Sequence, residues 1–580
     1  MVRRLFKNML MAQIMSSVAI TVCMLIDSIM IGQFLGVDAM AAYGLASPFL
    51  LLFAAFGAIL SMGIQVVCSR MMAEGNKDGV NKTFSVSIIF AAVLSVVAML
   101  LVIIMPNQIC RLLGASEGTV VFDMTKKYLQ GFLLGTPAFI AAQIFVPYLQ
   151  LSNNRMRLVL SVSIMTVVDI ILDFVNVWIF EGGIFGMGMA SAISYYAAIV
   201  LALIYFFSKK CIYKFRPKGL KLGDALEVLK NGIPTAVNQI CYVLQIYTLN
   251  NILISSGNSD GVAVYSILTT IGNFCFSTGN GIGSVALTLS GIFYVEEDRR
   301  SLEDIVKVVF KYAIIMNVVV TAVFFAFAPF IVHIFMSGED VPLDLSSYAL
   351  RLFSLCFIPA ALNSALKNYY QGVHRTWFTN LIALLQNLVF VSIAAFIFNA
   401  AVSERAVFFS FLVGEVLTFL SISIIIWKIN GKITMQASAF AFLPANFGVA
   451  EEDALQFSVS TVEEVCKSAT IASNFCRERT KDERRSMIVS LCIEEIANNI
   501  VQHGFEDGRP HHIDVRVSLK PDKWTIGIRD DCRLFDPVRY MRKYGTERDT
   551  SHFGIKLMFY MANDVKYVNT LGLNNLTITI

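Results

Sequence analysis

Charge is scarce through most of this sequence. Residues 1–445 hold only 50 of its 88 Asp, Glu, Lys and Arg residues, whereas the last 135 residues hold the other 38. With 56% hydrophobic residues and a mean hydropathy of +0.65, the chain is too apolar for an ordinary soluble protein. The composition therefore predicts a membrane protein with a polar C-terminal domain, two parts that lie in different solvents.

Two further absences exclude other classes of protein. The eleven cysteines include no C-x-x-C pair, which argues against a disulfide or zinc framework and suits a reducing compartment. The sequence contains no G-x-x-x-x-G-K-[ST] loop, which the motor of an ABC-type pump would need. The net charge of +4 fits basic loops beside anionic lipid, and we expect no nucleic-acid partner.

Long apolar runs fill the first part of the chain. A helix of about 20 apolar residues crosses a hydrocarbon core about 30 Å thick. We therefore expect twelve transmembrane helices, at about residues 9–31, 45–69, 83–105, 128–150, 158–180, 188–207, 231–255, 263–292, 312–336, 352–371, 377–400 and 406–427.

The connections between these runs differ in basic charge. When they are assigned to alternate sides, one set carries 22 Lys and Arg residues and the other only five: Arg111, Lys126, Lys127, Arg351 and Arg405. Short cytoplasmic loops carry the excess of Lys and Arg. The pattern predicts a multi-pass protein of a bacterial plasma membrane, with both termini in the cytoplasm.

The basic segment 208–230 divides the runs into six and six, and the halves resemble each other. Residues 128–150 and 348–372 both read Tyr, Leu, a mid-helix Pro and then Gln. Internal repeats of this kind are typical of secondary transporters, which bind their ligand near the midplane. We expect an N-terminal six-helix lobe (1–207), an inter-lobe loop (208–230), a C-terminal six-helix lobe (231–430), a linker (431–454) and a polar domain (455–580).

Three acidic residues fall inside the predicted spans of the first half. Asp27 lies deep in the first span, and Asp169 and Asp173 lie four residues apart on one face of the fifth. A carboxylate at the bilayer centre costs roughly 2.5–3.5 kcal/mol, so it is tolerated mainly where it faces a cavity or an ion. The three acids predict a cation or proton site. The alternatives are that Asp27 hydrogen-bonds a neighbouring helix and that Asp169 lies near the interface.

Four stretches resemble the signatures of the MATE (multidrug and toxic compound extrusion) transporters: "IDSIMIGQFLGVDAMAAYGLASPF", "MGIQVVCSRMMAEGNKDGVNKTF", "DIILDFVNVWIF" with "GIFGMGMASAIS", and "NGIPTAVNQ". The resemblance spans about residues 8–430. It implies twelve helices in two six-helix lobes around a cavity, and export of organic cations or other amphipathic compounds in exchange for H⁺ or Na⁺.

The same resemblance implies roles for particular residues. Asp27 and Asp173 fall on acidic positions of an ion site in the N-terminal lobe, Asp169 falls where that pattern often has Asn, and Ser191 is expected to supply a hydroxyl or to pack between helices. The second half offers amides and Lys367 at the corresponding spans, so we expect coupling in the N-terminal lobe. Lys367 either lines the cavity, where it would disfavour cations, or extends to the membrane interface, and its place near the cytoplasmic end favours the second.

In the polar C-terminal domain, the order of strand-like and helix-like segments predicts an α+β fold with helices on one face of a largely antiparallel sheet. Within it, "EEIANNIVQH", "IRDDCRLFDP" and "HFGIKLMFYMANDVKY" resemble motifs of the GHKL (Bergerat-fold) ATP-binding domains, as in anti-sigma-factor serine kinases. The resemblance implies an ATP site.

Four residues of these motifs have expected roles. Glu495 is the candidate catalytic base, and Asn499, one helical turn later, would offer an amide oxygen to Mg²⁺ on the phosphates. Asp530 would accept the adenine amino group, and Gly554 would let backbone N–H groups approach the phosphates.

Two departures from the resembled motifs weaken the expectation of catalysis. Cys532 and His552 stand where glycines are usual, and a side chain there can block the phosphates. His503, His511 and His512 lie outside any metal-ligand spacing, and we expect them on the surface.

Two functions follow from the sequence. The favoured one is a secondary-active antiporter for small amphipathic or cationic compounds, whose ATP-binding tail regulates transport or meets a protein partner. The alternative is a membrane-anchored serine kinase or signalling module with the membrane part as its sensor, and the enzyme question stays open. Buried acids favour the transporter, because an anchor needs only one or two helices and no intramembrane charge.

Overall fold

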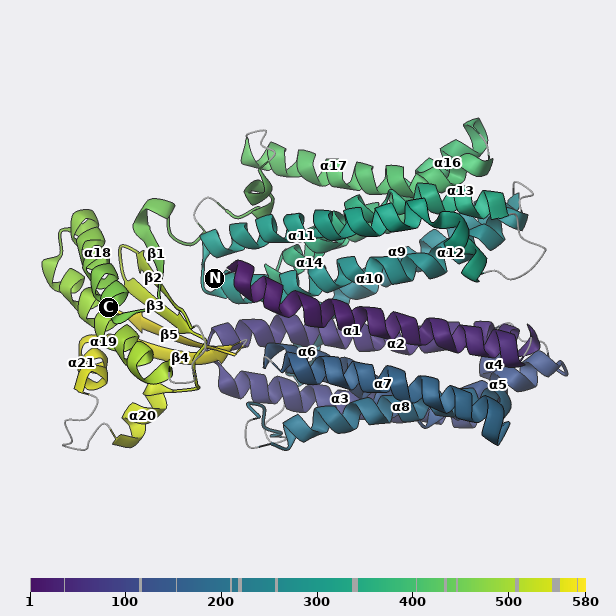
Figure 1. Cartoon of the computed structure of the whole chain (residues 1–580), viewed down its shortest axis with the longest axis horizontal. Coiled ribbons are helices and arrows are strands. Elements are labelled where there is room, and N and C mark those ends of the chain that lie inside the picture. Colours follow the sequence, from purple (N-terminus) through teal and green to yellow (C-terminus); the bar gives the residue numbers. More distant parts are fainter. Residues whose placement is uncertain are drawn as a thin grey trace.

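The computed structural model describes two helical bundles and an α+β domain at one end of them (Figure 1). The described residues are all those outside positions 1, 36, 114–116, 153, 209–210, 217–221, 256–258, 336–342, 403, 432–435, 445–446, 506–510, 545–552 and 571.

The N-terminal bundle contains the first eight α-helices and two π-helical turns. They are α1 (Val2–Met30), η1 (Ile31–Leu35), α2 (Val37–Ala73), α3 (Lys77–Ile104), α4 (Pro106–Leu112), α5 (Val120–Leu133), α6 (Thr136–Leu151), α7 (Arg155–Val175), η2 (Asn176–Phe180) and α8 (Gly183–Phe206).

The C-terminal bundle contains the next nine α-helices, one π-helical turn and one 3₁₀ turn. They are α9 (Leu222–Ser255), α10 (Ser259–Val295), α11 (Arg299–Ala326), α12 (Ala328–Phe335), α13 (Leu343–Ser354), α14 (Phe357–Gly372), α15 (Thr376–Leu384), η3 (Leu385–Val389), α16 (Phe390–Ala401), η4 (Glu404–Phe409) and α17 (Ser410–Asn430). Because α9 begins at Leu222, it takes up part of the segment expected to be a loop.

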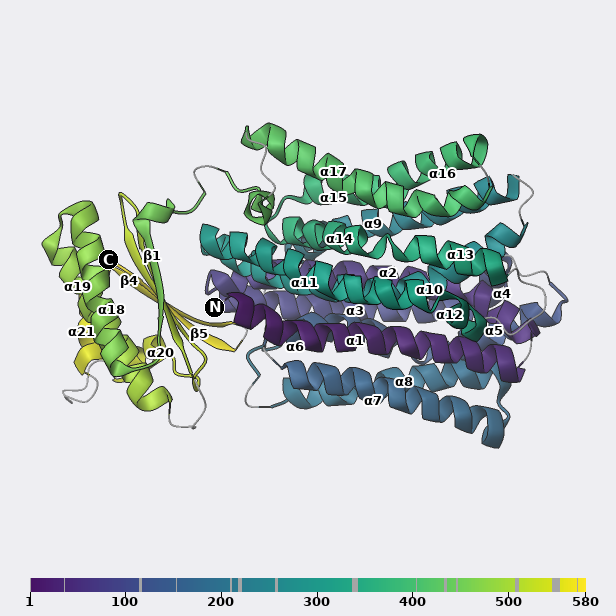
Figure 2. The same cartoon turned by 45° about the horizontal axis from the view of Figure 1, so that its top comes forward.

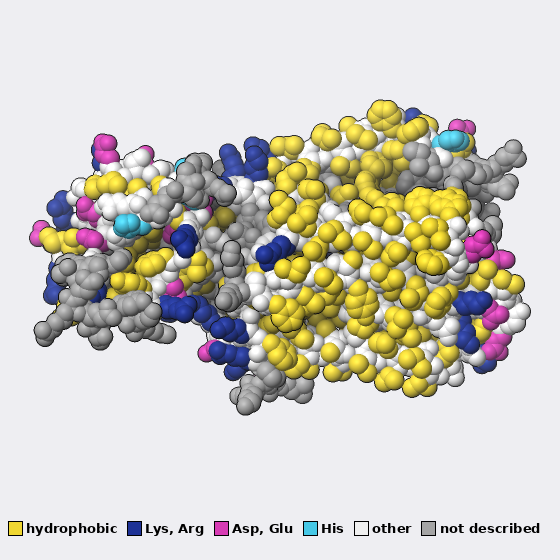
Figure 3. Space-filling model, turned by 60° about the horizontal axis from the view of Figure 1, so that its bottom comes forward, with side chains coloured by type: hydrophobic (Ala, Val, Ile, Leu, Met, Phe, Trp, Pro, Cys, Tyr) yellow, Lys and Arg dark blue, Asp and Glu magenta, His cyan; other side chains and the backbone are white. Residues whose placement is uncertain are grey.

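The helical body has the surface of a membrane protein. Apolar side chains cover its middle, and charged side chains gather toward its two ends (Figure 3). Within the described ranges, seven helices are long and apolar enough to cross a membrane, and two bent pairs raise the number to nine. The count of twelve spans and the lobe boundaries stay predictions.

The two bent pairs explain the repeated sequence shape. Helices α5 and α6 meet at 54°, and α13 and α14 meet at 45°. Each second helix carries a proline in its first turn, Pro137 in α6 and Pro359 in α14. Proline fits there because the first N–H groups of a helix have no partner inside it.

The bundles meet through close backbone contacts at the end nearer the α+β domain. A Cβ added to Gly63 of α2 would lie 2.1 Å from the carbonyl oxygen of Val228 in α9. A Cβ on Gly232 would lie 2.2 Å from that of Ile59. An ion pair between Arg70 and Glu227 joins the same two helices. Glycine is required at both crossings, since any side chain would separate the bundles.

The C-terminal domain is the predicted α+β layer. After two short 3₁₀ turns, η5 (Ala437–Ala441) and η6 (Glu451–Asp453), its elements are β1 (Ala454–Val459), α18 (Val462–Thr480), α19 (Glu483–Gly504), β2 (Ile513–Leu519), β3 (Trp524–Asp530), α20 (Pro537–Tyr544), α21 (Phe553–Met561), β4 (Asp564–Thr570) and β5 (Leu573–Thr579). The strands form one antiparallel sheet in the order β1-β2-β3-β5-β4.

Helices cover the face of this sheet that points away from the bundles, and the other face looks toward them (Figure 2). Thr461 and Asp482 cap α18 and α19 by accepting from backbone N–H groups of their first turns. Buried side chains of α18, α19 and α21 pack with those of the strands into one core, in which Val515, Ile526 and Ile578 are fully buried. The prediction of an antiparallel sheet with helices on one face is confirmed.

Candidate functional site

The N-terminal bundle brings together the three acids that the sequence singled out. Carboxylate oxygens of Asp27 on α1, and of Asp169 and Asp173 on α7, all lie within 4.8 Å of one another. Asp169 and Asp173 are buried, and Asp27 is half-buried. Packing of α1 against α7 joins residues that lie about 140 positions apart.

The chemistry of this cluster favours a cation or protons. Among the described residues, neither carboxylate oxygen of Asp173 has a hydrogen-bond partner. Buried ionised carboxylates so close together are costly unless positive charge compensates them. Oxygen ligands suit a hard cation such as Na⁺, and protonation removes the same repulsion. The donor set therefore fits either coupling ion.

Both helices that carry these acids change to π-helical geometry about one turn after them. The turn η1 begins four residues after Asp27, and η2 begins three residues after Asp173. Such π-turns occur frequently at functional sites. In η2, Asn176 donates to the Gly183 carbonyl at 3.0 Å, and a Cβ on Gly186 would lie 1.6 Å from its amide oxygen. The small residues of "GIFGMG" thus allow α8 to approach η2 closely.

Tyr128 and Ser191, two other residues of the N-terminal bundle, differ in their relation to this cluster. The hydroxyl of Tyr128 on α5 interacts electrostatically with Asp27 and Asp169, and its ring packs edge-on against Tyr43 at 5.4 Å. Sequence reasoning missed Tyr128. Ser191 is buried on α8, and no described contact joins its hydroxyl to the three acids.

The C-terminal bundle contains a polar cavity of about 190 Å³ with an acid that sequence reasoning missed. Glu415 on α17 accepts from Asn363 at 2.8 Å and from Gln386 at 3.1 Å. A lone acid in the apolar run 406–427 was the signal that could have revealed it.

Lys367 lines this cavity, so the favoured expectation that it extends to the interface is wrong and the alternative holds. Its ammonium donates to Asn238 at 2.6 Å and to Gln386 at 3.4 Å. Gln386 therefore bridges Lys367 and Glu415, because its oxygen accepts from one and its nitrogen donates to the other. An adjacent cavity residue, Asn387, also donates to Asn238 at 2.8 Å.

The C-terminal domain contains a pocket of about 460 Å³ between α19 and the sheet. Asn499 and Asp530 line it, as the resembled motifs imply. The Asp530 carboxylate accepts from Asn574 at 2.8 Å and from the Cys532 N–H at 3.0 Å. Asn574 in turn accepts from the Tyr567 hydroxyl at 2.6 Å. Burial raises the pKa of Asp530, and these two donors oppose that shift.

Glu495 and Gly554 also lie together. A Cβ on Gly554 would be 1.8 Å from a carboxylate oxygen of Glu495. The bare Cα of Gly554 therefore admits this carboxylate to the beginning of α21, where helix N–H groups favour negative charge. Cys532 packs against Gly504 and lines the same pocket, and His552 lies outside the described residues.

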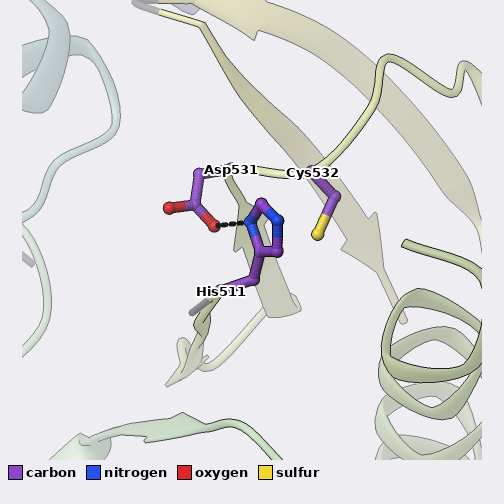
Figure 4. A group of neighbouring side chains, drawn as sticks. All are labelled: His511, Asp531 and Cys532. Atoms are coloured by element: carbon purple, nitrogen blue, oxygen red, sulfur yellow. Dashed lines mark hydrogen bonds and ion pairs between the residues drawn. The ribbon is translucent and has the colours of Figure 1, made fainter. Parts of the chain in front are cut away.

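The expectation of surface histidines is wrong for His511. This residue is buried, with its Nδ1 3.0 Å from Asp531, and its ligand atoms lie within 4.8 Å of those of Asp531 and Cys532 (Figure 4). The antiparallel pairing of β2 with β3 brings the start of β2 beside the end of β3, which sequence spacing alone does not show. His503 is exposed at the pocket, and His512 contacts Ser460 at 2.9 Å.

Comparison with known families agrees with this division of the chain. The MatE family model matches residues 12–175 and again residues 234–397, and the model of the histidine kinase-like ATPase domain matches residues 458–580. The two MatE matches coincide with the two bundles.

Relatives and solved structures resemble the bundles. The multidrug export protein MepA of Staphylococcus saprophyticus is 23% identical over 399 residues, which cover 68% of this chain and 87% of that protein. MepA of Staphylococcus aureus is 22% identical over 402 residues, which cover 69% of this chain and 87% of that protein.

Solved structures also resemble the bundles. An outward-facing multidrug resistance MATE transporter superposes with a TM-score of 0.68 at 19% identity, covering 72% of this chain and 94% of the other. A Pyrococcus furiosus MOP superfamily transporter, described as having a binding pocket of reversed polarity, gives a TM-score of 0.67 at 19% identity and the same coverage. At this identity the superpositions establish the fold of the bundles.

Proposed function

The chain belongs to the MatE family, and on that premise we propose that it is a secondary-active efflux transporter. It exports organic cations or other amphipathic compounds in exchange for H⁺ or Na⁺. The relatives named as multidrug export proteins support this assignment, as does the match of the family to both bundles. The observation that carries it is the cluster of Asp27, Asp169 and Asp173.

The cluster gives exchange a physical basis. A buried group of carboxylates binds either protons or a cation in order to offset its charge. An entering ion and a leaving organic cation can then alternate, since each compensates charge that the other leaves behind. Asp27 and Asp173 are the principal ion ligands in this proposal, with Asp169 adding charge and Ser191 in a supporting place on α8.

The proposed orientation follows from the basic connections. The 22 Lys and Arg residues on one set of loops assign that side, both termini and the C-terminal domain to the cytoplasm of a bacterial cell. Export then runs away from the end that carries the domain.

The C-terminal domain is proposed to bind ATP with Mg²⁺ as a regulatory module. Asn499 would hold Mg²⁺ through its amide oxygen, Asp530 would accept from adenine, and Gly554 would admit the phosphates to the start of α21. Glu495 would position water or act as base. Since Glu495 lies against Gly554, these two groups must separate before a phosphate can occupy that position. The domain match supports binding, and transport itself is driven by the ion gradient.

Reconstitution into vesicles tests the transport proposal. Purified full-length protein in liposomes should move ethidium, a fluorescent organic cation, when a pH or Na⁺ gradient is imposed. The gradient that drives transport identifies the ion. Ethidium movement that is independent of both gradients would contradict ion-coupled antiport.

Nucleotide binding has its own test on the full-length protein. Titration calorimetry with Mg-ATP should show binding that Asn499→Ala weakens by about tenfold or more, because a Mg²⁺ ligand is lost. Asn498→Ala is the matched control, since Asn498 is the preceding residue on α19 and does not line the pocket. Equal binding by wild type and Asn499→Ala would remove Asn499 from the site.

A further inference from the structure

The helix-free face of the C-terminal sheet presents charged residues in register. On β2, Asp514 and Arg516 alternate with the buried Val515 and Val517, and Lys520 follows with the same period of two. Arg529 on β3 lies opposite Asp514 in the antiparallel register. Alternate residues of a strand point to opposite faces, so these side chains project away from the domain core. They lie on the face of the sheet that looks toward the bundles, and Figure 2 shows that face.

Three of these residues hold the connection between α10 and α11 of the C-terminal bundle. The Arg516 guanidinium donates to the carbonyl oxygens of Glu296 and Glu297 at 3.2 Å. Lys520 pairs with the Glu297 carboxylate, and Arg529 pairs with that of Glu296. The Arg529 guanidinium also lies 4.9 Å from the ring centre of Phe293, in α10 itself. Main-chain acceptors, carboxylates and an aromatic ring together fix this connection on the sheet.

The same sheet also holds the N-terminal bundle. Arg4 of α1 lies 3.6 Å from Asp514 of β2. At the rim of the sheet, Lys77 at the start of α3 lies 3.4 Å from Asp536, which precedes α20, and 5.8 Å from the ring centre of Tyr567, whose side chain lines the pocket on the helix-covered face. A Cβ on Gly75 would contact Val568 at 3.3 Å.

One hydrogen-bonded sheet therefore contacts both bundles at the end where they also contact each other. Its strands are joined without interruption from β1 to β4. The Arg70–Glu227 ion pair and the glycine crossings of α2 with α9 lie at the same end. Separation of the bundles there would break the sheet's contacts with one of them.

We propose that the helix-free face of the sheet, together with the adjoining rim at Asp536 and Tyr567, is a docking surface for the chain's own two bundles, and that it acts as a brace against their separation at that end. This inference rests on the proposed transport function. In a transporter that works by alternating access, the bundles separate first on one side of the membrane and then on the other. Breaking contacts with either bundle should shift the protein toward the state open at the domain end.

The brace shares its strands with the nucleotide pocket. Asp530 lines the pocket and the adjacent Arg529 reaches the C-terminal bundle from the opposite face of β3. Tyr567 lines the pocket and its ring faces Lys77. A nucleotide in the pocket therefore touches residues that are next to, or part of, the contacts with each bundle.

Distance measurement across the domain end tests the brace without depending on transport. Spin labels at Lys82→Cys on α3 and Lys307→Cys on α11 would report the separation, in full-length protein with Cys211, Cys466 and Cys532 replaced by serine. Lys520→Glu places like charges together at Glu297 and should raise the population of wide separations by about two- to fivefold, the effect of one partly exposed ion pair. Lys77→Ala, which removes one of the contacts with the N-terminal bundle, should raise the same population.

Charge exchange provides the decisive control. Lys520→Glu combined with Glu297→Lys restores opposite charges and should restore the wild-type distances. Lys467→Glu is the matched control, because Lys467 pairs only with Glu463 among the described residues, on α18. Wild-type distances in both Lys520→Glu and Lys77→Ala would overturn the brace. So would a shift that the exchanged pair fails to reverse. Absence of gradient-driven ethidium transport in the wild-type protein, with the distance shifts present, would instead count against the proposed transport function and leave the brace standing.

Discussion

The two bundles have similar helices and a similar proline bend, yet their buried charges differ. The N-terminal bundle gathers Asp27, Asp169 and Asp173 at one point. Among the described residues that line the cavity of the C-terminal bundle, one acid and one base, Glu415 and Lys367, are joined through the side chain of Gln386. The first arrangement accumulates negative charge, and the second is nearly neutral by itself.

The acids of the N-terminal bundle need a bound ion or proton to compensate their charge, whereas the charges of Glu415 and Lys367 have partners within the protein. Carboxylates brought together in a membrane favour a bound cation or proton, because positive charge offsets their mutual repulsion at this short distance. A bridged acid and base with amide partners satisfies its own charges, and such a group fixes the geometry of a cavity wall. We therefore propose that ion coupling takes place in the N-terminal bundle and that the bridged pair shapes a polar cavity in the C-terminal one.

The largest expected effect is on the acidic cluster. Asp173→Asn removes a fully buried carboxylate while keeping its shape. Gradient-driven efflux from vesicles should fall by more than about tenfold, equivalent to about 1.4 kcal/mol or more. Thermal unfolding in detergent should change little, because the substitution also relieves repulsion. Asp123→Asn, at an exposed position on α5 of the same bundle, should leave efflux unchanged. Wild-type efflux by Asp173→Asn would remove the distinction between the bundles.

The next effect concerns the bridged pair in the C-terminal bundle. Lys367→Met leaves Glu415 buried with amides alone, and removing one member of a buried pair costs roughly 3–5 kcal/mol. The melting temperature of the purified protein should therefore fall clearly. Combining it with Glu415→Gln removes both charges and should recover most of the loss. If the double variant were as unstable as the sum of the single ones, the two residues would act independently and the comparison would fail.

The sequence predicted the N-terminal site more fully than the C-terminal one for a physical reason. Asp169 and Asp173 share a helix face, so their spacing alone places them together. Asp27 joins them only through packing of α1 against α7, which the family resemblance supplied and spacing could not. Glu415 was overlooked because its partners, Asn363 and Gln386, are ordinary amides on distant helices. Lys367 was misplaced because a basic residue near a helix end commonly extends to the interface.

In the C-terminal domain, too, sequence spacing did not reveal which side chains meet in the folded structure. The order of strands and helices in the sequence predicted an antiparallel sheet with helices on one face, and the structure confirms it. The burial of His511 beside Asp531 depends on the antiparallel register of β2 with β3. That register is a property of the folded sheet, and no local spacing in "GRPHHIDV" encodes it.

The smallest effect would refine the comparison. Asp169→Asn leaves two of the three clustered acids, with an amide where the resembled pattern often has one. Efflux should change by less than about threefold, or below about 0.7 kcal/mol. The preference between H⁺ and Na⁺ gradients should move toward Na⁺, because an amide oxygen can ligate a metal cation but does not take up a proton near neutral pH. Driving efflux with each gradient separately measures that preference. An unchanged preference would mean that Asp27 and Asp173 alone select the ion, and Asp169 would then serve only to add negative charge to the cluster.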